Sequence, residues 1–439
     1  MSINQKRGFK YLTFTLAPAL LIVLMVLVPT MSMGQGEESQ VPAEFETCTD
    51  CHNDTTLITG KATAWSGSGH GTGTAYLRST NAGCAGCHSG GAFSAMVAAG
   101  QSPNQVTTGD HSPTRQSCRA CHQIHETYTG TDWALETTAP VGLYAIEGTT
   151  FDGGSGNLCT NCHQPRRAAP VGVDGQVTGI SSHWGPHHGP QSSMLLGTGG
   201  AALEGSAAGH YTFVGDTCVS CHLGANDNHT FTPSVAACTT CHAGASNFDI
   251  GGRQTAIQAK IDQLGTLLVN AGLLSSTDPA EAHPNVSSAP EDQAYALWNW
   301  ILIAKEDRSK GVHNPAYTED LLDASIALMC DGAPALSIMV DNVYWASLAD
   351  YTGRLLSVDY IIGNGGTNAF NVMLTNSSAN NGVSVASPLP ASIGDMTAGA
   401  SAPITLQYNV PSGVSTFRAS NGATAQDNCG TTYEYGTQP

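Results

Sequence analysis

The chain has 439 residues and a formal net charge of −18, with 34 aspartates and glutamates against 16 lysines and arginines. This acidity argues against nucleic acid as a partner, because proteins bind phosphate backbones through clustered positive charge. A basic electron-transfer partner or a small soluble molecule remains compatible with such a surface.

The first 36 residues have the pattern of a signal peptide. Lys6, Arg7 and Lys10 precede an apolar run over residues 11–28, and small residues that suit cleavage follow at Ser32 and Gly34. The apolar run is long for a signal peptide, so a retained N-terminal anchor is the alternative. No second stretch is long and apolar enough to cross a bilayer. We expect an exported protein, in the periplasm, outside the cell or at the surface of a prokaryote.

Residues 37–250 contain six copies of Cys-x-x-Cys-His. In each copy, two thiols can add to the two vinyl groups of one haem, and the adjacent histidine can bind the iron axially. A zinc site or a redox pair would explain one copy, but six copies that all end in histidine predict six covalently bound haem c groups. The expected attachment residues are Cys48, Cys51, Cys84, Cys87, Cys118, Cys121, Cys159, Cys162, Cys218, Cys221, Cys238 and Cys241, and the expected proximal ligands are His52, His88, His122, His163, His222 and His242.

The composition of residues 37–250 points to the same cofactor. Glycine, serine, threonine and alanine dominate, and large aliphatic residues are sparse. Such a segment buries too little apolar surface to offset the entropy lost on folding. The porphyrins would supply the missing interior, which predicts a mostly irregular and α-helical hexahaem domain that is unfolded without haem. The motifs begin 20 to 59 residues apart, so neighbouring haems are expected to lie in or near contact.

The sixth ligand of each iron separates an electron carrier from an enzyme. Beyond the six motif histidines, ten of the 16 histidines remain, enough to give every haem a second histidine. Such haems are closed to substrate and suit electron exchange. Met96 and Met194 are the alternative ligands, and we expect both to be packing residues. The adjacent His187 and His188 are expected to supply one ligand between them, with the choice open. The strong candidates are His70, His125, His187, His188, His210, His229 and His313, and the weaker ones are His111, His183 and His283.

Residues 251–330 predict a helical segment that packs on the haem domain. Apolar residues recur at helical spacing over residues 255–274. Pro290 opens a second helix that ends before Gly311, and Pro315 opens a third that continues to about Leu328.

Residues 331–439 predict an all-β sandwich of immunoglobulin-like type. Short alternating segments separated by turns are expected to form strands at 337–345, 355–362, 369–374, 383–386, 404–410 and 414–419. This region has no histidine, so we expect an adhesive, spacer or assembly role. In an exported protein Cys330 and Cys429 could form a disulfide, with two buried free thiols as the alternative.

Residues 45–330 resemble bacterial multihaem cytochromes related to ammonia-forming nitrite reductase and to the octahaem hydroxylamine oxidoreductase class. The stretches that carry the resemblance are 184–191, 195–199, 229–231, 290–307 and 311–315. The resemblance implies that His187 or His188, His210, His229 and His313 are distal haem ligands. Nitrite reductases of this group commonly have lysine in place of one motif histidine. All six motifs here end in histidine, and no Arg–Tyr–His trio for an oxyanion is evident.

These features favour an electron carrier without catalytic residues. Six closely spaced haems would relay electrons in respiration between a membrane or periplasmic donor and an extracellular acceptor, such as another cytochrome or a mineral. A homo-oligomer or filament is compatible with the added sandwich. The alternative is an oxidoreductase of a small nitrogen or sulfur compound at one five-coordinate haem, and the number of open irons discriminates between the two.

Overall fold

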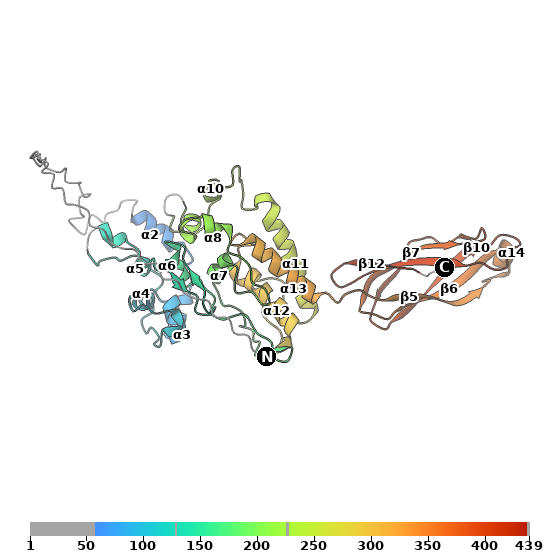
Figure 1. Ribbon diagram of the computed structural model, residues 1–439, viewed down its shortest axis with the longest axis horizontal. Helices are drawn as coiled ribbons and strands as arrows, with labels where there is room; N and C mark the ends of the chain where they lie inside the picture. Colours follow the sequence, from blue (N-terminus) through green and yellow to red (C-terminus); the bar gives the residue numbers. More distant parts are fainter. Residues whose placement is uncertain (1–57, 128–129, 225–227, 437–439) are drawn as a thin grey trace, which may run out of the picture.

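The computed structural model describes residues 58–127, 130–224 and 228–436. The expected signal peptide and the first motif, with Cys48, Cys51 and His52, lie outside these residues. Residues 58–329 form one body, and the strands that follow form an elongated second body at the opposite end of the molecule (Figure 1). No helix in the described part of the chain has the length and apolar character needed to span a membrane.

The described residues before α11 contain five of the Cys-x-x-Cys-His motifs and are called the motif region. They consist of short elements joined by long loops. The apolar clusters of the motif region are small, and the largest side chains in them are Phe93, Met96, Leu143 and Phe151. The elements are α2 (Thr59–Ser66), η1 (Ala75–Thr80), α3 (Ala82–His88), α4 (Gly90–Ala98), η2 (Pro103–Gln105), α5 (Cys118–Cys121), η3 (Gly130–Trp133), β1 (Val141–Gly142), β2 (Thr150–Phe151), α6 (Gly156–Thr160), β3 (Gln176–Thr178), α7 (Gln191–Leu196), α8 (Gly209–Phe213), α9 (Cys218–His222), α10 (Val235–Cys238) and η4 (Ile250–Gly252).

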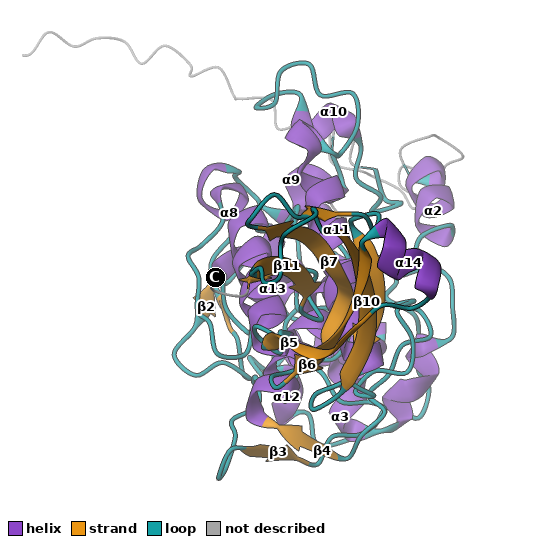
Figure 2. Ribbon diagram, turned by 90° about the vertical axis from the view of Figure 1, so that its right-hand side faces the viewer, coloured by secondary structure: helices purple, strands orange, loops and turns teal. Residues whose placement is uncertain are grey.

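Three longer helices follow and share one core. They are α11 (Arg253–Asn270), α12 (Glu291–Trp300) and α13 (Pro315–Met329), and α12 continues into the π-helical η5 (Ile301–Asp307). α13 begins where expected because the Asn314 side chain accepts a hydrogen bond from the Tyr317 N–H and Pro315 occupies the first turn. Before α12, β4 (Ser288–Pro290) pairs with β3 to form a small sheet that contacts this helix (Figure 2).

The core of the helices extends into the motif region. Trp300, fully buried between α11 and α12, donates from Nε1 to the Ile261 carbonyl at 3.0 Å. Met194 of α7 is fully buried in the same core, and Met96 is buried in a separate small cluster. Both methionines are therefore packing residues, as expected. Tyr317 of α13 accepts a bond from the Gly200 N–H at 2.9 Å, which ties the helices to the loop after α7.

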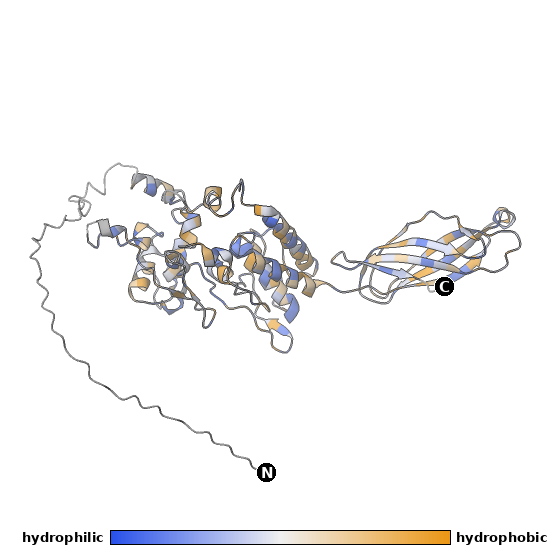
Figure 3. Cartoon of the chain, turned by 45° about the horizontal axis from the view of Figure 1, so that its top comes forward, coloured by the Kyte–Doolittle hydropathy of each residue, from blue (hydrophilic) through white to orange (hydrophobic). Residues whose placement is uncertain are grey.

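The C-terminal part is a sandwich of two antiparallel four-stranded sheets, with strand orders β5-β6-β10-β8 and β12-β11-β7-β9. Polar and apolar residues alternate along the strands (Figure 3), as in Val358, Tyr360 and Ile362 of β6, whose side chains enter the shared core. Cys330 and Cys429 form a disulfide at the base of the sandwich. The strands are β5 (Leu336–Tyr344), β6 (Leu355–Asn364), β7 (Ala369–Ala379), β8 (Ser384–Val385), β9 (Ala391–Met396), β10 (Ser401–Asn409), β11 (Ala419–Gln426) and β12 (Thr432–Gly436), with a short helix α14 (Leu348–Gly353) after β5.

The expectation of a strand over residues 414–419 is wrong. Residues 411–418 form a turn and irregular chain, and β11 begins at Ala419. β11 is built from small residues, and its inward positions are Ala423 and Ala425. Strands β9 and β11 were missed because they lack the β-branched runs on which the sequence pattern depends. β12 was also missed, although Thr432, Tyr433 and Tyr435 favour a strand.

Candidate metal centres

The structure pairs each motif histidine of the described residues with one histidine from outside the motifs. The partners come from distant parts of the sequence, and the separation of the two ring centres is nearly the same in all five pairs. The pairs are His88–His187 at 6.3 Å, His122–His229 at 6.2 Å, His163–His70 at 6.2 Å, His222–His313 at 6.4 Å and His242–His210 at 6.2 Å.

The shared separation is the one expected for two imidazoles on opposite sides of one metal ion. A metal–imidazole bond of about 2.0 Å, with the nitrogen about 1.1 Å from the ring centre, gives a span of about 6.2 Å. Aromatic rings in direct contact also fall in this range of distances. However, the angles between the ring planes run from 26° to 77° across the five pairs. The pairs therefore share a distance and not a ring-packing geometry.

Hydrogen bonds at Nδ1 direct the other ring nitrogen of several histidines. His122, His222 and His210 donate from Nδ1 to backbone carbonyls at 2.7, 2.9 and 2.7 Å. A carbonyl oxygen can only accept, so in a neutral ring Nδ1 carries the proton and Nε2 is left with a free lone pair. This tautomer is the one that binds a metal through Nε2.

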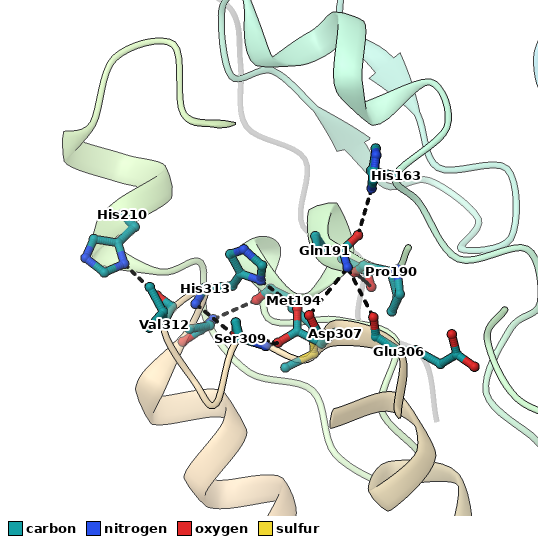
Figure 4. Close-up of polar contacts among 12 residues, drawn as sticks. His163, Pro190, Gln191, Met194, His210, Glu306, Asp307, Ser309, Val312 and His313 are labelled. Carbon is teal, nitrogen blue, oxygen red and sulfur yellow. Dashed lines mark hydrogen bonds and ion pairs between the residues drawn. The ribbon is translucent and has the colours of Figure 1, made fainter. Parts of the chain in front are cut away.

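Two further histidines of the pairs contact side chains (Figure 4). Nδ1 of His163 lies 3.1 Å from Oε1 of Gln191, and Nδ1 of His313 lies 2.6 Å from Oδ1 of Asp307. Gln191 also donates from Nε2 to the Glu306 carbonyl at 3.2 Å, so α7 connects the His163 ring to the end of η5.

Burial lowers the pKa of five of these ten histidines, namely His70, His88, His122, His163 and His187. Desolvation, with a smaller effect of neighbouring His163, lowers the pKa of His70 to about 4, and desolvation together with His188 lowers the pKa of His187 to about 4. His313 is the exception: burial lowers its pKa, but the charge and hydrogen bond of Asp307 outweigh burial and raise it. Neutral imidazole is the form that binds a metal, so His70 and His187 are suited to this role at neutral pH.

The five described motifs lie on single helical turns. The backbone N–H groups of His122, His163 and His242 bond to the carbonyl of the first cysteine of their motifs at 2.8–2.9 Å. In such a turn, residues three and four apart share one face. Both thiols and the imidazole of a motif therefore lie on the same side of the chain, as one flat ligand requires.

Several of the described motifs contact one another. The Cys162 thiol lies 3.9 Å from the Cys87 carbonyl oxygen, and the thiols of Cys159 and Cys218 are close enough to interact electrostatically. The 159–163 motif therefore lies between the 84–88 motif and α9. Cys221 of α9 is in turn close enough to Cys238 to interact electrostatically.

Phe231 connects three of the histidine pairs. Its ring centre lies 4.8 Å from that of His70 and 6.0 Å from that of His229. Its carbonyl accepts the bond from His222 at 2.9 Å. Phe231, Gln191 and Asp307 lie in the stretches 229–231, 184–191 and 290–307 that carry the resemblance. The sequence assigned no role to them, because contacts between distant loops leave no local pattern.

Two of the seven strong candidates, His125 and His188, are not placed beside a described motif histidine. His125 lies with Nδ1 2.8 Å from Nη2 of Arg119. His188 bonds through Nδ1 to Glu306 at 2.6 Å, and its side chain is 66% exposed. Of the adjacent histidines 187 and 188, only His187 therefore opposes a motif histidine in the described residues.

The weaker candidates have local contacts. His183 contacts the Ser182 hydroxyl at 3.1 Å, and His283 contacts the Pro284 carbonyl at 3.2 Å. His111 lies beside Asp110, whose pKa is lowered mainly by hydrogen bonds from Ser89 and Ser112.

Comparison with protein-family models and with curated proteins finds no match for this chain. The resemblance to multihaem cytochromes therefore rests on the motifs and on the stretches of sequence named above.

Proposed function

We propose that this chain is a multihaem c-type cytochrome that relays electrons, with one haem c bound at each of its six motifs. The observation that carries the proposal is the set of five opposed histidine pairs, all separated by 6.2–6.4 Å and each containing one motif histidine. Bound haem would supply reversible one-electron exchange at its iron. The chain would supply two thioether bonds and both axial nitrogens at each of these five sites.

Exposed apolar side chains beside the pairs fit a large flat ligand. Phe213 is 85% exposed and lies one helical turn after His210 on α8. The partly exposed Trp133 ring lies 6.4 Å from the ring of His122. Large apolar residues that face solvent beside a cofactor motif are explained if a porphyrin covers them.

Two protein ligands per site favour a carrier over an enzyme. A histidine on each side of the iron fills both axial positions and leaves no position for substrate. The arrangement accounts for five of the six motifs, and the first motif lies outside the described residues. No residue of the chain is proposed to be catalytic.

The contacts between motifs support a relay. Cys87 and Cys162 join the 84–88 and 159–163 motifs, Cys159 and Cys218 join the latter to α9, and Cys221 approaches Cys238. We propose that electrons follow this order of sites. The 118–122 motif adjoins the 159–163 motif as well, because Cys121 is close enough to Cys159 and Cys162 to interact electrostatically, and it therefore forms a branch of the relay.

The sandwich and the acidic surface suit an exported protein. Two four-stranded sheets on one core support an immunoglobulin-like fold for residues 331–439, which we propose acts as a spacer or assembly module. The partners would be a membrane or periplasmic electron donor and an extracellular acceptor, or further copies of the chain.

Electron paramagnetic resonance and carbon monoxide binding on the purified holoprotein test the function. We expect low-spin signals from at least five haems and no turnover of nitrite or hydroxylamine with a reduced dye. A high-spin signal with stoichiometric carbon monoxide uptake by one haem, together with rapid turnover of either compound, would overturn the carrier in favour of an oxidoreductase.

A further inference from the structure

The His313 ring contacts a buried carboxylate. The Asp307 side chain has no exposed surface, and its Oδ1 lies 2.6 Å from Nδ1 of His313. Its Oδ2 accepts bonds from Oγ and N of Ser309 at 2.5 and 3.3 Å (Figure 4). Both oxygens are therefore held, and the carboxylate has one fixed orientation toward the imidazole.

Other histidines of the pairs bond to neutral oxygens. His122, His222 and His210 bond to backbone carbonyls, and His163 contacts an amide oxygen. His313 thus differs from these four in the charge of the group that holds it. The carboxylate is buried, so solvent screens its charge weakly.

A carboxylate behind a ligating histidine changes the metal that the histidine binds. When the carboxylate accepts a hydrogen bond from the Nδ1–H group, the imidazole becomes a stronger electron donor at Nε2. A stronger donor stabilises the more positive, oxidised metal, and hydrogen bonding around axial ligands is one of the means by which proteins set haem potentials. A negative charge close by acts in the same direction.

We propose that Asp307 is a positioning residue that lowers the reduction potential of the iron held between His222 and His313 below that of the irons at the other four described pairs. The inference rests on the proposed function, because it requires haem at α9. One electron enters this site and one leaves, while the proton stays on Nδ1 of His313 and Asp307 keeps its charge. α9 lies between the 159–163 and 238–242 motifs. Electron transfer onto the α9 site from either neighbour would therefore be unfavourable in free energy.

Asp307→Asn tests the proposal in the full-length holoprotein. Asparagine keeps an oxygen that can accept from Nδ1 and removes the charge. In a redox titration followed by optical and paramagnetic resonance spectra, we expect one of the six potentials to rise. Each tenfold loss of preference for the oxidised iron corresponds to about 59 mV for a one-electron couple. Asp307→Glu should restore most of the original potential.

Glu306→Gln is the matched control. Glu306 is the preceding residue and is also largely buried, but its carboxylate bonds to His188, and its charge acts on His187 of the 84–88 site and not on His313. We expect Glu306→Gln to leave the potential of the α9 site unchanged. If Asp307→Asn is poorly folded, Ser309→Ala removes one of the bonds that orient the carboxylate and should raise the same potential by a smaller amount.

Two outcomes would overturn the proposal. Potentials that stay unchanged in Asp307→Asn, with all haems present, would show that Asp307 does not tune the iron. An equal shift in Glu306→Gln would reduce the effect to general charge. Protein that carries no haem would instead refute the proposed function itself.

Discussion

His187 and His188 are neighbours in sequence and differ in their environment. The His187 ring opposes His88, and burial lowers its pKa to about 4. The hydrogen bond from His188 to Glu306 raises the pKa of His188, and its side chain faces solvent. The same residue type thus has a form suited to metal binding at one position and a hydrogen bond to a largely buried carboxylate at the next.

Replacing each of these histidines in turn tests the assignment of the ligand. His187 has a φ of 73°, a conformation that glycine adopts without strain, so His187→Gly should leave the backbone in place. We expect His187→Gly to convert one haem to the high-spin form and to let it bind one carbon monoxide. His188→Gly should leave all haem spectra unchanged. A high-spin haem in His188→Gly alone would reverse the assignment.

The sequence offered seven strong candidates for the distal ligands and no means to choose among them. In the described residues, five of the seven lie beside a motif histidine, and His125 and His188 do not lie beside a described one. Motif spacing fixes which residues can bind one haem. It carries no information on which loop approaches that haem from the other side, because that approach depends on tertiary contacts.

Helices α11, α12 and α13 were predictable because local signals define their ends. Pro290 precedes acidic residues in the first turn of α12, and Asn314 with Pro315 starts α13. The expected α11 ended four residues too late, because its apolar pattern continues into the buried turn residues Leu273 and Leu274. In the sandwich, the strands of small residues were missed, since only their packing identifies them.

A charge cluster between α11 and α13 gives a pH-dependent prediction at the scale of elements. Lys260 donates to Glu319 at 3.0 Å and to Asp323 at 2.7 Å, and its hydrogen bond lowers the pKa of Glu319 below 4.5. At neutral pH, Lys260→Met should lower the free energy of unfolding by about 0.5–1 kcal/mol, as for other partly exposed ion pairs.

Acid should remove the effect of that substitution. A carboxylate with a lowered pKa in the folded state stabilises the fold above its usual pKa, and this stabilisation is lost as the pH falls through the folded value. Thermal melting followed by helical circular dichroism at neutral pH and at about pH 3 measures the difference. A difference that persists in acid would show that Lys260 acts through packing and not through charge.

At the scale of the whole molecule, the apolar cores separate the sandwich from the rest. One core contains Met194 together with the helices α11 to α13, and a second contains only residues of the sandwich. The disulfide from Cys330 to Cys429 and a bond from Asn428 Nδ2 to the Met329 carbonyl at 2.8 Å hold the junction. The motif region and the helices therefore form one folded body.

Deleting residues 336–439, with Cys330→Ser to remove the unpaired thiol, tests this division. The core around Met194 loses the contact with Cys429 and the bond from Asn428 to the Met329 carbonyl, both at its edge, so the haem spectrum of the shortened protein should match that of the full chain. Location at the cell surface or assembly should be impaired, as judged by cell fractionation and by the size of the purified particle. Loss of the haem spectrum would contradict two separate bodies.

Porphyrins bound through thioethers are proposed to form the interior of residues 37–250. Intact mass spectrometry of protein secreted by a host that attaches haem c would detect them. We expect the mass of the mature polypeptide plus six haems, together with a strong Soret absorption that survives denaturation. The mass of the bare polypeptide, or the absence of Soret absorption, would contradict the account.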